Sequence, residues 1–228
     1  MMSETSISHE RMDRLFKAAI DRQQEAESFV AYLTEQDGLR DLSRSILRDR
    51  ELLAALARES YEHENGFLKL LVHRPHDDRY RVRLHLWPSI DERAQNIHDH
   101  RFDFWSVVLI GSVTNHIWAK GAGMEHPHFK YHPRAGQSFY EMERTGAEML
   151  HPVRKFEVRQ GQHYFFDSNW LHTIACSSTT VTCMLEDRRS LKPYANVFMR
   201  SDAASQRLLR PAPALSESAY KSVLMRFV

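Results

Sequence analysis

Residues 97–111 read IHDHRFDFWSVVLIG, and this stretch decides the fold class. His98 and His100 stand two positions apart, so on a strand their imidazoles face the same side and can bind one ion. A His-x-His pair alone is weak evidence for a metal, because so short a motif often arises by chance. The residues from Phe104 onward are rich in aromatic and β-branched side chains and stop at Gly111, which indicates a strand.

Short segments of the same kind surround this stretch. In residues 80–87 the apolar Tyr, Val and Leu side chains occupy one face, and Arg81, Arg83, His85 and Trp87 occupy the other. Many short strands without helices between them indicate an antiparallel sandwich or barrel. We expect a turn at 76–78 and a longer loop, punctuated by Gly and Pro, at 119–135. The expected strand segments are FLKLLVHR, YRVRLHLW, FWSVVLIG, VTNHIW, SFYEME, KFEVRQG, QHYFF and TVTCMLE.

The two ends of the chain have the period of helices instead. Apolar residues recur at helical spacing over residues 9–34, and further helical stripes follow up to about residue 64. A short helix is expected from Ser216 to about Phe227. We therefore predict a helical N-terminal extension packed on the barrel (1–64), the β-barrel itself (65–210) and a C-terminal helix (211–228).

The composition excludes several classes of protein. The 228 residues, 42% of them hydrophobic, can bury a core without disulfides. The 31 Lys and Arg residues against 30 Asp and Glu residues leave a net charge of +1, too little for nucleic-acid binding. The two Cys fit a reduced compartment, and no signal-peptide or membrane-length apolar run occurs. We expect a cytoplasmic monomer or homodimer that has no nucleic-acid or membrane partner.

The first motif of the cupin superfamily fits the opening stretch. That motif has His-x-His, an acidic ligand after three or four residues, and Gly after six more. In this chain those positions hold His98, His100, Phe104 and Gly111. The spacing is kept, but the acidic ligand is replaced by an aromatic residue.

The second cupin motif fits residues 161–176, which read GQHYFFDSNWLHTIAC. The spacing from Gly to His172 is kept, and Asp167-Ser168-Asn169 replaces the usual Pro-x-Gly, which still suits a tight turn. The chain thus resembles cupins over about residues 67–190. The resemblance implies a mainly β, cupin-type antiparallel barrel (a jelly roll) with one divalent metal on this histidine and the two of the first motif.

A cupin with three histidines and no acidic ligand is similar to the thiol dioxygenases, the family of cysteine dioxygenase. The segments LHLW before IHDH and DSNWLH around His172 agree with this similarity. The Ser-x-His-x-Tyr run of that family is missing, because residues 182–186 read TCMLE. The resemblance implies Fe²⁺ as the metal, with Zn, Ni or Mn as alternatives, because imidazole binds all of these ions.

A dication held by neutral ligands favours an anionic substrate, such as an amino acid or another small carboxylate. A bidentate guanidinium is the preferred partner of a carboxylate, and Arg74, Arg81 and Arg83 are the candidates. Arg74 matches the position that the thiol dioxygenases use. The alternative is a solvated strand face, because charged side chains are rarely buried unpaired.

Other residues are assigned to the site with open alternatives. Phe102, Phe104 and Trp105 are expected to wall a dry pocket. Tyr164 and Glu186 are candidate catalytic residues, although Glu186 could equally form an ordinary ion pair at the rim. His126, His128 and His132 fall in the expected loop, where a surface position is favoured over a second metal site.

Two functions from different classes follow from these observations. The first is a non-heme Fe(II) dioxygenase that uses O₂ on a small amino-acid-like or thiol-bearing carboxylate. The alternative is a redox-silent metal-dependent cupin, either an isomerase, lyase or hydrolase, or a module that binds a small molecule. Fold alone does not decide between them.

Overall fold

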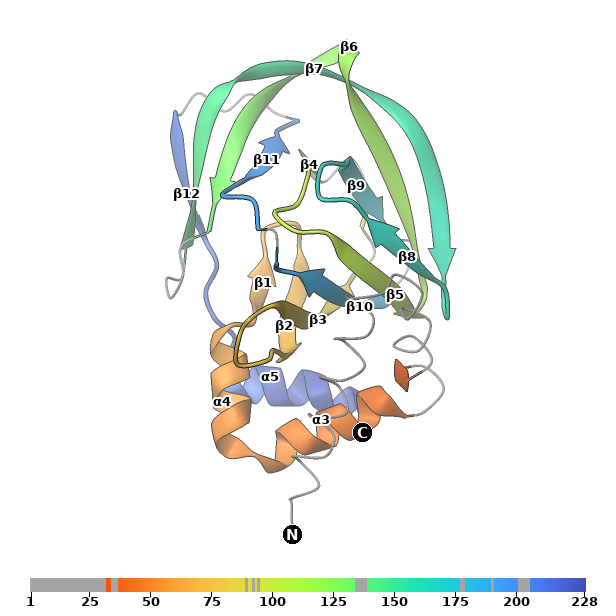
Figure 1. Ribbon diagram of the computed structural model, residues 1–228, viewed down its shortest axis with the longest axis vertical. Coiled ribbons are helices and arrows are strands. Elements are labelled where there is room, and N and C mark those ends of the chain that lie inside the picture. Colours follow the sequence, from red (N-terminus) through yellow and green to blue (C-terminus); the bar gives the residue numbers. More distant parts are fainter. Residues whose placement is uncertain are drawn as a thin grey trace.

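Two antiparallel sheets make up most of the structure, a computed structural model (Figure 1). It describes residues 32–33, 37–88, 90–91, 93, 95–133, 139–176, 179–189, 191–200 and 206–228. The structure confirms a mainly β, antiparallel fold with helices before and after the sheets, and the cupin type stays a prediction. The predicted helix over residues 9–34 lies almost wholly outside the described residues.

The first sheet carries the alternating segments on which the prediction rested. In spatial order its strands are β1 (Tyr61–His63), β2 (Phe67–His73), β3 (Tyr80–Trp87), β10 (Thr180–Asp187), β5 (Phe104–Ile110) and β8 (His163–Phe166). Alternation along β3 sends Val82, Leu84 and Leu86 to the outer face of this sheet. Its other face turns inward, as the arginine hypothesis requires.

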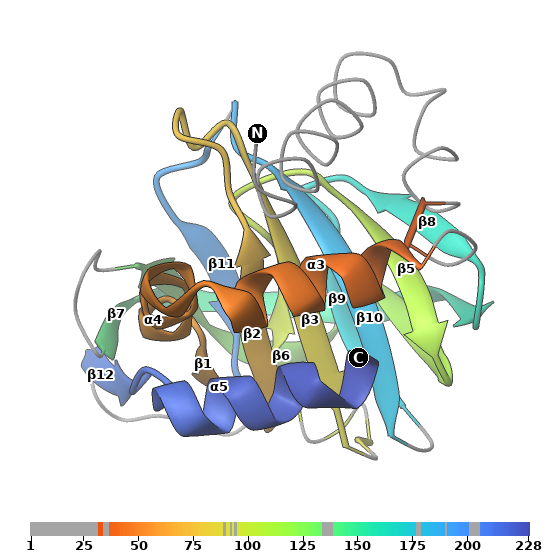
Figure 2. The same ribbon diagram turned by 90° about the horizontal axis from the view of Figure 1, so that it is seen from below.

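Three helices cover the outer face of the first sheet (Figure 2). They are α3 (Gly38–Arg48), α4 (Arg50–Arg58) and α5 (Glu217–Leu224), and a 3₁₀ turn, η3 (Met225–Phe227), follows α5. Ser216 caps α5 through its side chain, which accepts a hydrogen bond from the Ala219 amide. Tyr220 is fully buried and donates its hydroxyl to the Leu71 carbonyl at 2.6 Å, which ties α5 to β2. Among the described residues, no helix combines the length and apolarity that crossing a membrane requires.

The second sheet is dominated by one long hairpin that arches over the molecule (Figure 1). In spatial order its strands are β11 (Ala195–Phe198), β4 (Ile97–His98), β9 (Leu171–Ala175), β6 (Ser112–His132), β7 (Phe139–Arg159) and β12 (Arg207–Pro211). A cavity of about 960 Å³ lies between the two sheets and is lined by residues of both.

Two local predictions are wrong. The loop expected at 119–135 is strand up to His132, because Gly121 and Gly123 adopt positive φ angles of 133° and 118° within a bulge of β6. The helical preface expected up to residue 64 ends at Arg58, and β1 follows and pairs with β2. The two glycines therefore mark a bulge within a strand, and the polar residues after Arg58 begin the first sheet.

Candidate metal centre

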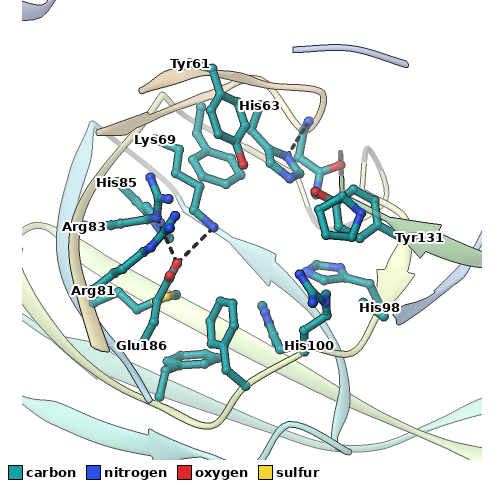
Figure 3. A pocket seen from close by; sticks show the side chains of 18 of the residues that line it. Tyr61, His63, Lys69, Arg81, Arg83, His85, His98, His100, Tyr131 and Glu186 are labelled. Carbon is teal, nitrogen blue, oxygen red and sulfur yellow. Dashed lines mark hydrogen bonds and ion pairs between the residues drawn. The ribbon is translucent and has the colours of Figure 1, made fainter. Parts of the chain in front are cut away.

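The three predicted histidines meet at one wall of the cavity. Figure 3 shows two of them, His98 and His100, on this wall. His98 ends β4 and lies directly opposite His172 of β9, while His100 follows two residues later and faces the same side. Their ligand atoms all lie within 4.8 Å of one another, and the two Nε2 atoms of His100 and His172 are 2.8 Å apart. Within the part of the chain that the structure describes, these three residues are the group of side chains that could hold a metal ion.

Hydrogen bonds at the far side of two rings orient them for metal binding. His98 Nδ1 lies 2.9 Å from the Asn96 carbonyl, and His172 Nδ1 lies 3.0 Å from Asn115 Oδ1. Because both acceptors are oxygen atoms, each Nδ1 carries the proton, which leaves each Nε2 with a free lone pair. Such partners fix the tautomer and orientation of metal-binding histidines in general.

These residues fit a divalent ion. A metal–nitrogen distance of ~2.0–2.1 Å places neighbouring ligand atoms roughly 3 to 3.4 Å apart. The 2.8 Å between His100 Nε2 and His172 Nε2 is close to this value, and all ligand atoms of the triad lie within 4.8 Å of one another. Burial lowers the pKa of His98, although the Asn96 carbonyl and the charge of Asp99 partly offset this. Burial lowers the pKa of His100 and His172 further, and the neighbouring histidines add to the effect. Neutral imidazoles with converging lone pairs are the state that an ion binds.

Phe104, at which the resemblance expects an acidic ligand in many cupins, lies beside His100. It is buried, stacks on Phe166 at 5.1 Å between ring centroids, and places its ring edge-on to His100 at 4.8 Å. Phe102 also lines the cavity, 6.1 Å from His100. An apolar wall therefore replaces a carboxylate beside the triad.

The nearby carboxylates are held by other groups. Asp99 accepts hydrogen bonds from the Asn196 amide and side chain, both at 2.6 Å, and pairs with Lys192 at 3.0 Å. Asp103 accepts from the Ser168 amide at 2.7 Å. Both carboxylates thus stabilise loops behind the triad, which agrees with a site of three neutral ligands.

The opposite wall of the cavity is a connected network of charges (Figure 3). Glu186, which is buried, lies 3.0 Å from Arg83 Nε, 3.3 Å from Lys69 Nζ and 4.0 Å from Arg188 Nη1. Burial raises the pKa of Glu186, but the charges of these cations outweigh it and bring the pKa below its usual value. Glu186 is therefore ionised at neutral pH and acts as an ion-pair partner, which favours the alternative to a catalytic base.

All three predicted arginines line the cavity, and each is paired with the protein's own carboxylates. Arg74 is half-exposed and lies 3.0 Å from Glu59. Arg81 forms a fork with Asp78, at 2.7 and 3.1 Å, and reaches Glu59 at 3.2 Å. Arg83 is buried against Glu186 and also donates to the Glu59 carbonyl at 3.1 Å. Their inward position is confirmed, and their role in substrate binding stays a prediction.

Tyr164 and Trp105 lie in different environments. Tyr164 lines the cavity; burial raises its pKa, and hydrogen bonds to Asn115 and Ser106 partly offset this, so its hydroxyl stays protonated. Trp105 alternates with Phe104 along β5 and packs in the core on the outer face of the sheet, 4.9 Å from Phe165. The prediction that Trp105 walls the pocket is therefore wrong, because it lies on the opposite face of its strand.

The histidines of the expected loop serve the hairpin. His126 Nδ1 lies 3.0 Å from the Met199 carbonyl, and His128 Nε2 lies 2.8 Å from Asn196 Oδ1. Both lie on strand β6, where they connect the hairpin to the segment around β11.

Sequence reasoning missed several residues of the cavity. Lys69 and His85 face it from neighbouring strands, directly opposite each other in the β2–β3 register. Strand parity indicated the inward face of His85, but the sequence held no signal for Lys69 beyond its place in an apolar strand. Asn115 was missed because a strand residue that orients a histidine has no motif of its own.

Comparison with known proteins gives distant structural matches. No family model matches the sequence, and no curated protein matches it. A DMSP lyase structure is 16% identical to this chain, with a TM-score of 0.34, and the match covers 55% of this chain and 49% of the lyase chain. Hydroquinone 1,2-dioxygenase in complex with Cd²⁺ and 4-hydroxybenzonitrile is 12% identical, with a TM-score of 0.31, over 53% and 64%. An RmlC-like cupin from Shewanella frigidimarina is 12% identical, with a TM-score of 0.33, over 57% and 84%.

With TM-scores of 0.31 to 0.34, these matches assign no family and no role to this chain. The matched part spans about half of the DMSP lyase chain and less than two thirds of the dioxygenase chain. The similarity to thiol dioxygenases in particular stays a prediction.

Proposed function

We propose that this protein is a non-heme Fe(II) dioxygenase that acts on a small amino-acid-like or thiol-bearing carboxylate. The observation that carries the proposal is the triad of His98, His100 and His172, whose free Nε2 atoms converge on a cavity with cations on its opposite wall. A bound iron ion would supply sites for substrate and O₂ and the redox chemistry between them.

The protein's own residues hold and orient the reactants. Three neutral ligands leave the charge of a dication uncompensated, so an anionic substrate is favoured at this wall. The opposite wall holds five cations, namely Lys69, Arg74, Arg81, Arg83 and Arg188, against the three carboxylates of Glu59, Asp78 and Glu186. This local excess of positive charge supports an acidic group at the other end of the substrate.

Aromatic side chains control the space beside the triad. Phe104 and Phe166 pack against His100, and Tyr164 lies edge-on to Phe104 with 6.2 Å between ring centroids. Their bulk excludes water from one side of the ligands, which strengthens electrostatic interactions there. The protonated Tyr164 hydroxyl is a candidate hydrogen-bond donor to a bound reactant.

The test combines metal analysis with oxygen uptake. We expect purified protein to contain close to one first-row divalent ion per chain, with iron supporting O₂ consumption on a panel of amino acids and thiol acids. Protein reloaded with Zn²⁺ is the matched control, because it keeps the ligand geometry without redox chemistry. Turnover of a substrate by the Zn²⁺ form without O₂ uptake would overturn the oxygenase and favour the redox-silent cupin.

A further inference from the structure

We propose that Lys69 and His85 form the subsite for the acidic group of the substrate, at the wall of the cavity opposite the metal ligands. The inference rests on the proposed function and assigns a position to the anionic group that the function requires. It also gives the substrate a shape, with a metal-binding atom at one end and a carboxylate at the other.

Lys69 has donors to spare, whereas Arg81 uses its Nε, Nη1 and Nη2 atoms on Asp78 and Glu59. Arg83 donates Nη1 to the Glu59 carbonyl and is held against Glu186 by an ion pair of 3.0 Å. The Lys69 ammonium lies 3.3 Å from Glu186 Oε1, but this oxygen takes part in no hydrogen bond among the described residues. An ammonium carries three N–H donors, so Lys69 can bind a further carboxylate without giving up its ion pair.

His85 supplies a second polar atom at the same place. Its side chain is buried, with an exposed fraction of 3%, and it lines the cavity beside Lys69 across the β2–β3 pair. Within the described part of the chain its Nε2 atom has no hydrogen-bond partner. A buried polar atom without a partner is costly, and a ligand carboxylate that accepts from Nε2–H would remove that cost.

The position of Lys69 relative to the triad suits a substrate that spans the cavity. The Lys69 ammonium lies 5.9 Å from the centroid of the Phe102 ring, and that ring lies 6.1 Å from the His100 ring. Phe102 therefore provides an apolar floor between the cation and the metal ligands. Glu186 lies 3.3 Å from Lys69 Nζ and 3.0 Å from Arg83 Nε, so its carboxylate belongs to the charged wall.

The experiment compares acids with alcohols that are otherwise alike. The probes are ω-mercapto acids, from 3-mercaptopropionate to 6-mercaptohexanoate, and the ω-mercapto alcohols of the same lengths. Each probe is titrated into Co²⁺-loaded protein. Calorimetry gives the affinity of each acid and of the alcohol of the same length, and the ratio of the two is the preference for the acid. Absorption bands of the thiolate–Co²⁺ pair report whether the probe binds the metal. We expect the wild-type protein to prefer the acid about tenfold to a hundredfold at the best length.

Variants assign that preference to residues. Lys69→Met should abolish it, Lys69→Arg should retain part of it, and His85→Phe, which keeps the ring, should reduce it about threefold to tenfold. Lys120→Met is the matched control, because Lys120 also lies 3.3 Å from a glutamate, Glu148, but on the exposed hairpin. The preference should be unchanged in that control.

The outcomes separate the subsite from the proposed function. A wild-type protein without acid preference, or a preference that survives in folded Lys69→Met, would overturn the subsite. If Lys69→Met fails to fold, an unchanged preference in both Lys69→Arg and His85→Phe would overturn it. Absence of thiolate–Co²⁺ bands at saturating probe contradicts the proposed function instead, and the calorimetric preference still decides the subsite.

Discussion

The two walls of the cavity differ in charge, because one carries neutral side chains and the other carries ionised side chains. The metal wall consists of neutral imidazoles whose outer nitrogen atoms are held by oxygen acceptors of Asn96 and Asn115. The facing wall consists of ionised side chains, with more cations than carboxylates, around the buried Glu186. The first arrangement suits a cation and the second suits an anion, so under the proposed function the two walls would together select a ligand that joins a metal-binding atom to an acidic group.

Breaking the metal wall should have the largest effect. We expect His98→Ala, His100→Ala and His172→Ala each to reduce bound metal from about one ion per chain to nearly none, because two imidazoles bind a divalent ion weakly. Metal content after exchange into buffered Fe²⁺ or Zn²⁺ is the measurement, with circular dichroism to confirm the fold. Full retention of metal in two of the three variants would refute the assignment, and loss of the fold would make these histidines structural.

Replacing arginines of the charged wall should lower the free energy of unfolding. Arg83→Ala leaves the buried Glu186 without its nearest cation, so we expect the free energy of unfolding to fall by about 3–5 kcal/mol. Arg74→Ala should change it by less than about 1 kcal/mol, because that ion pair is half-exposed. Urea denaturation checks the order, with Arg81→Ala expected between the two.

The same three variants test the predicted arginine clamp. A stable Arg74, Arg81 or Arg83 variant that loses its preference for an acidic ligand would identify that arginine as the anchor. Unchanged preference in all three would leave the arginines as supports of the wall.

Sequence patterns predicted the metal wall better than the charged wall. Strand periodicity placed His98 and His100 on one side, and the second motif placed His172, because metal ligands keep a fixed spacing. Lys69 has no such spacing, since its role depends on Glu186, which is 117 positions away in the sequence and becomes its neighbour through the sheet. The hairpin was mistaken for a loop because Gly121 and Gly123 indicate a turn as readily as they indicate a bulge.

The partner of His172 sharpens the comparison, because the metal wall depends on orientation as well as on ligand identity. We expect Asn115→Ala to weaken metal affinity about tenfold, since His172 would lose the acceptor that fixes its tautomer. Competition with a chromophoric chelator measures this affinity. Asn115→Asp, which keeps an acceptor at the same place, should retain most of it, and equal loss in both variants would contradict an orienting role.

The two walls should also fail at different pH. Burial lowers the pKa of His98, His100 and His172 in the folded, metal-free protein, so the unfolded chain binds protons first, at its ordinary pKa of 6.5. Stability is therefore present above pH 6.5 and is lost as the pH falls below it, by up to about 1.4 kcal/mol per pH unit for each histidine. The lowered pKa of Glu186 has the usual carboxylate sign, so its contribution is lost only as the pH falls below about 4.5.

Urea midpoints of metal-free protein between pH 7.5 and pH 3.5 should show these two losses in that order. Bound metal should raise the midpoints at pH 7.5 but should not reduce the first loss, because the ion keeps the folded imidazoles unprotonated while the unfolded chain still binds protons. A midpoint that stays constant from pH 7.5 to pH 5.5 would show that the histidines are not held neutral.

The smallest expected change comes from giving the metal wall a charge of its own. Phe104 stands where the sequence resemblance to cupins expects an acidic ligand, and its ring lies 4.8 Å from that of His100. In Phe104→Glu a carboxylate can bind the ion, lower its net charge and fill one coordination position. We expect metal to be retained and an acidic thiol probe to bind severalfold more weakly, because the neutral character of this wall is what attracts an anion. Phe104→Leu is the control for lost packing against Phe166, and it should keep the wild-type preference for the acidic probe. Equal weakening in both variants would mean that the aromatic ring matters here through its shape and that charge at this position does not set the selectivity.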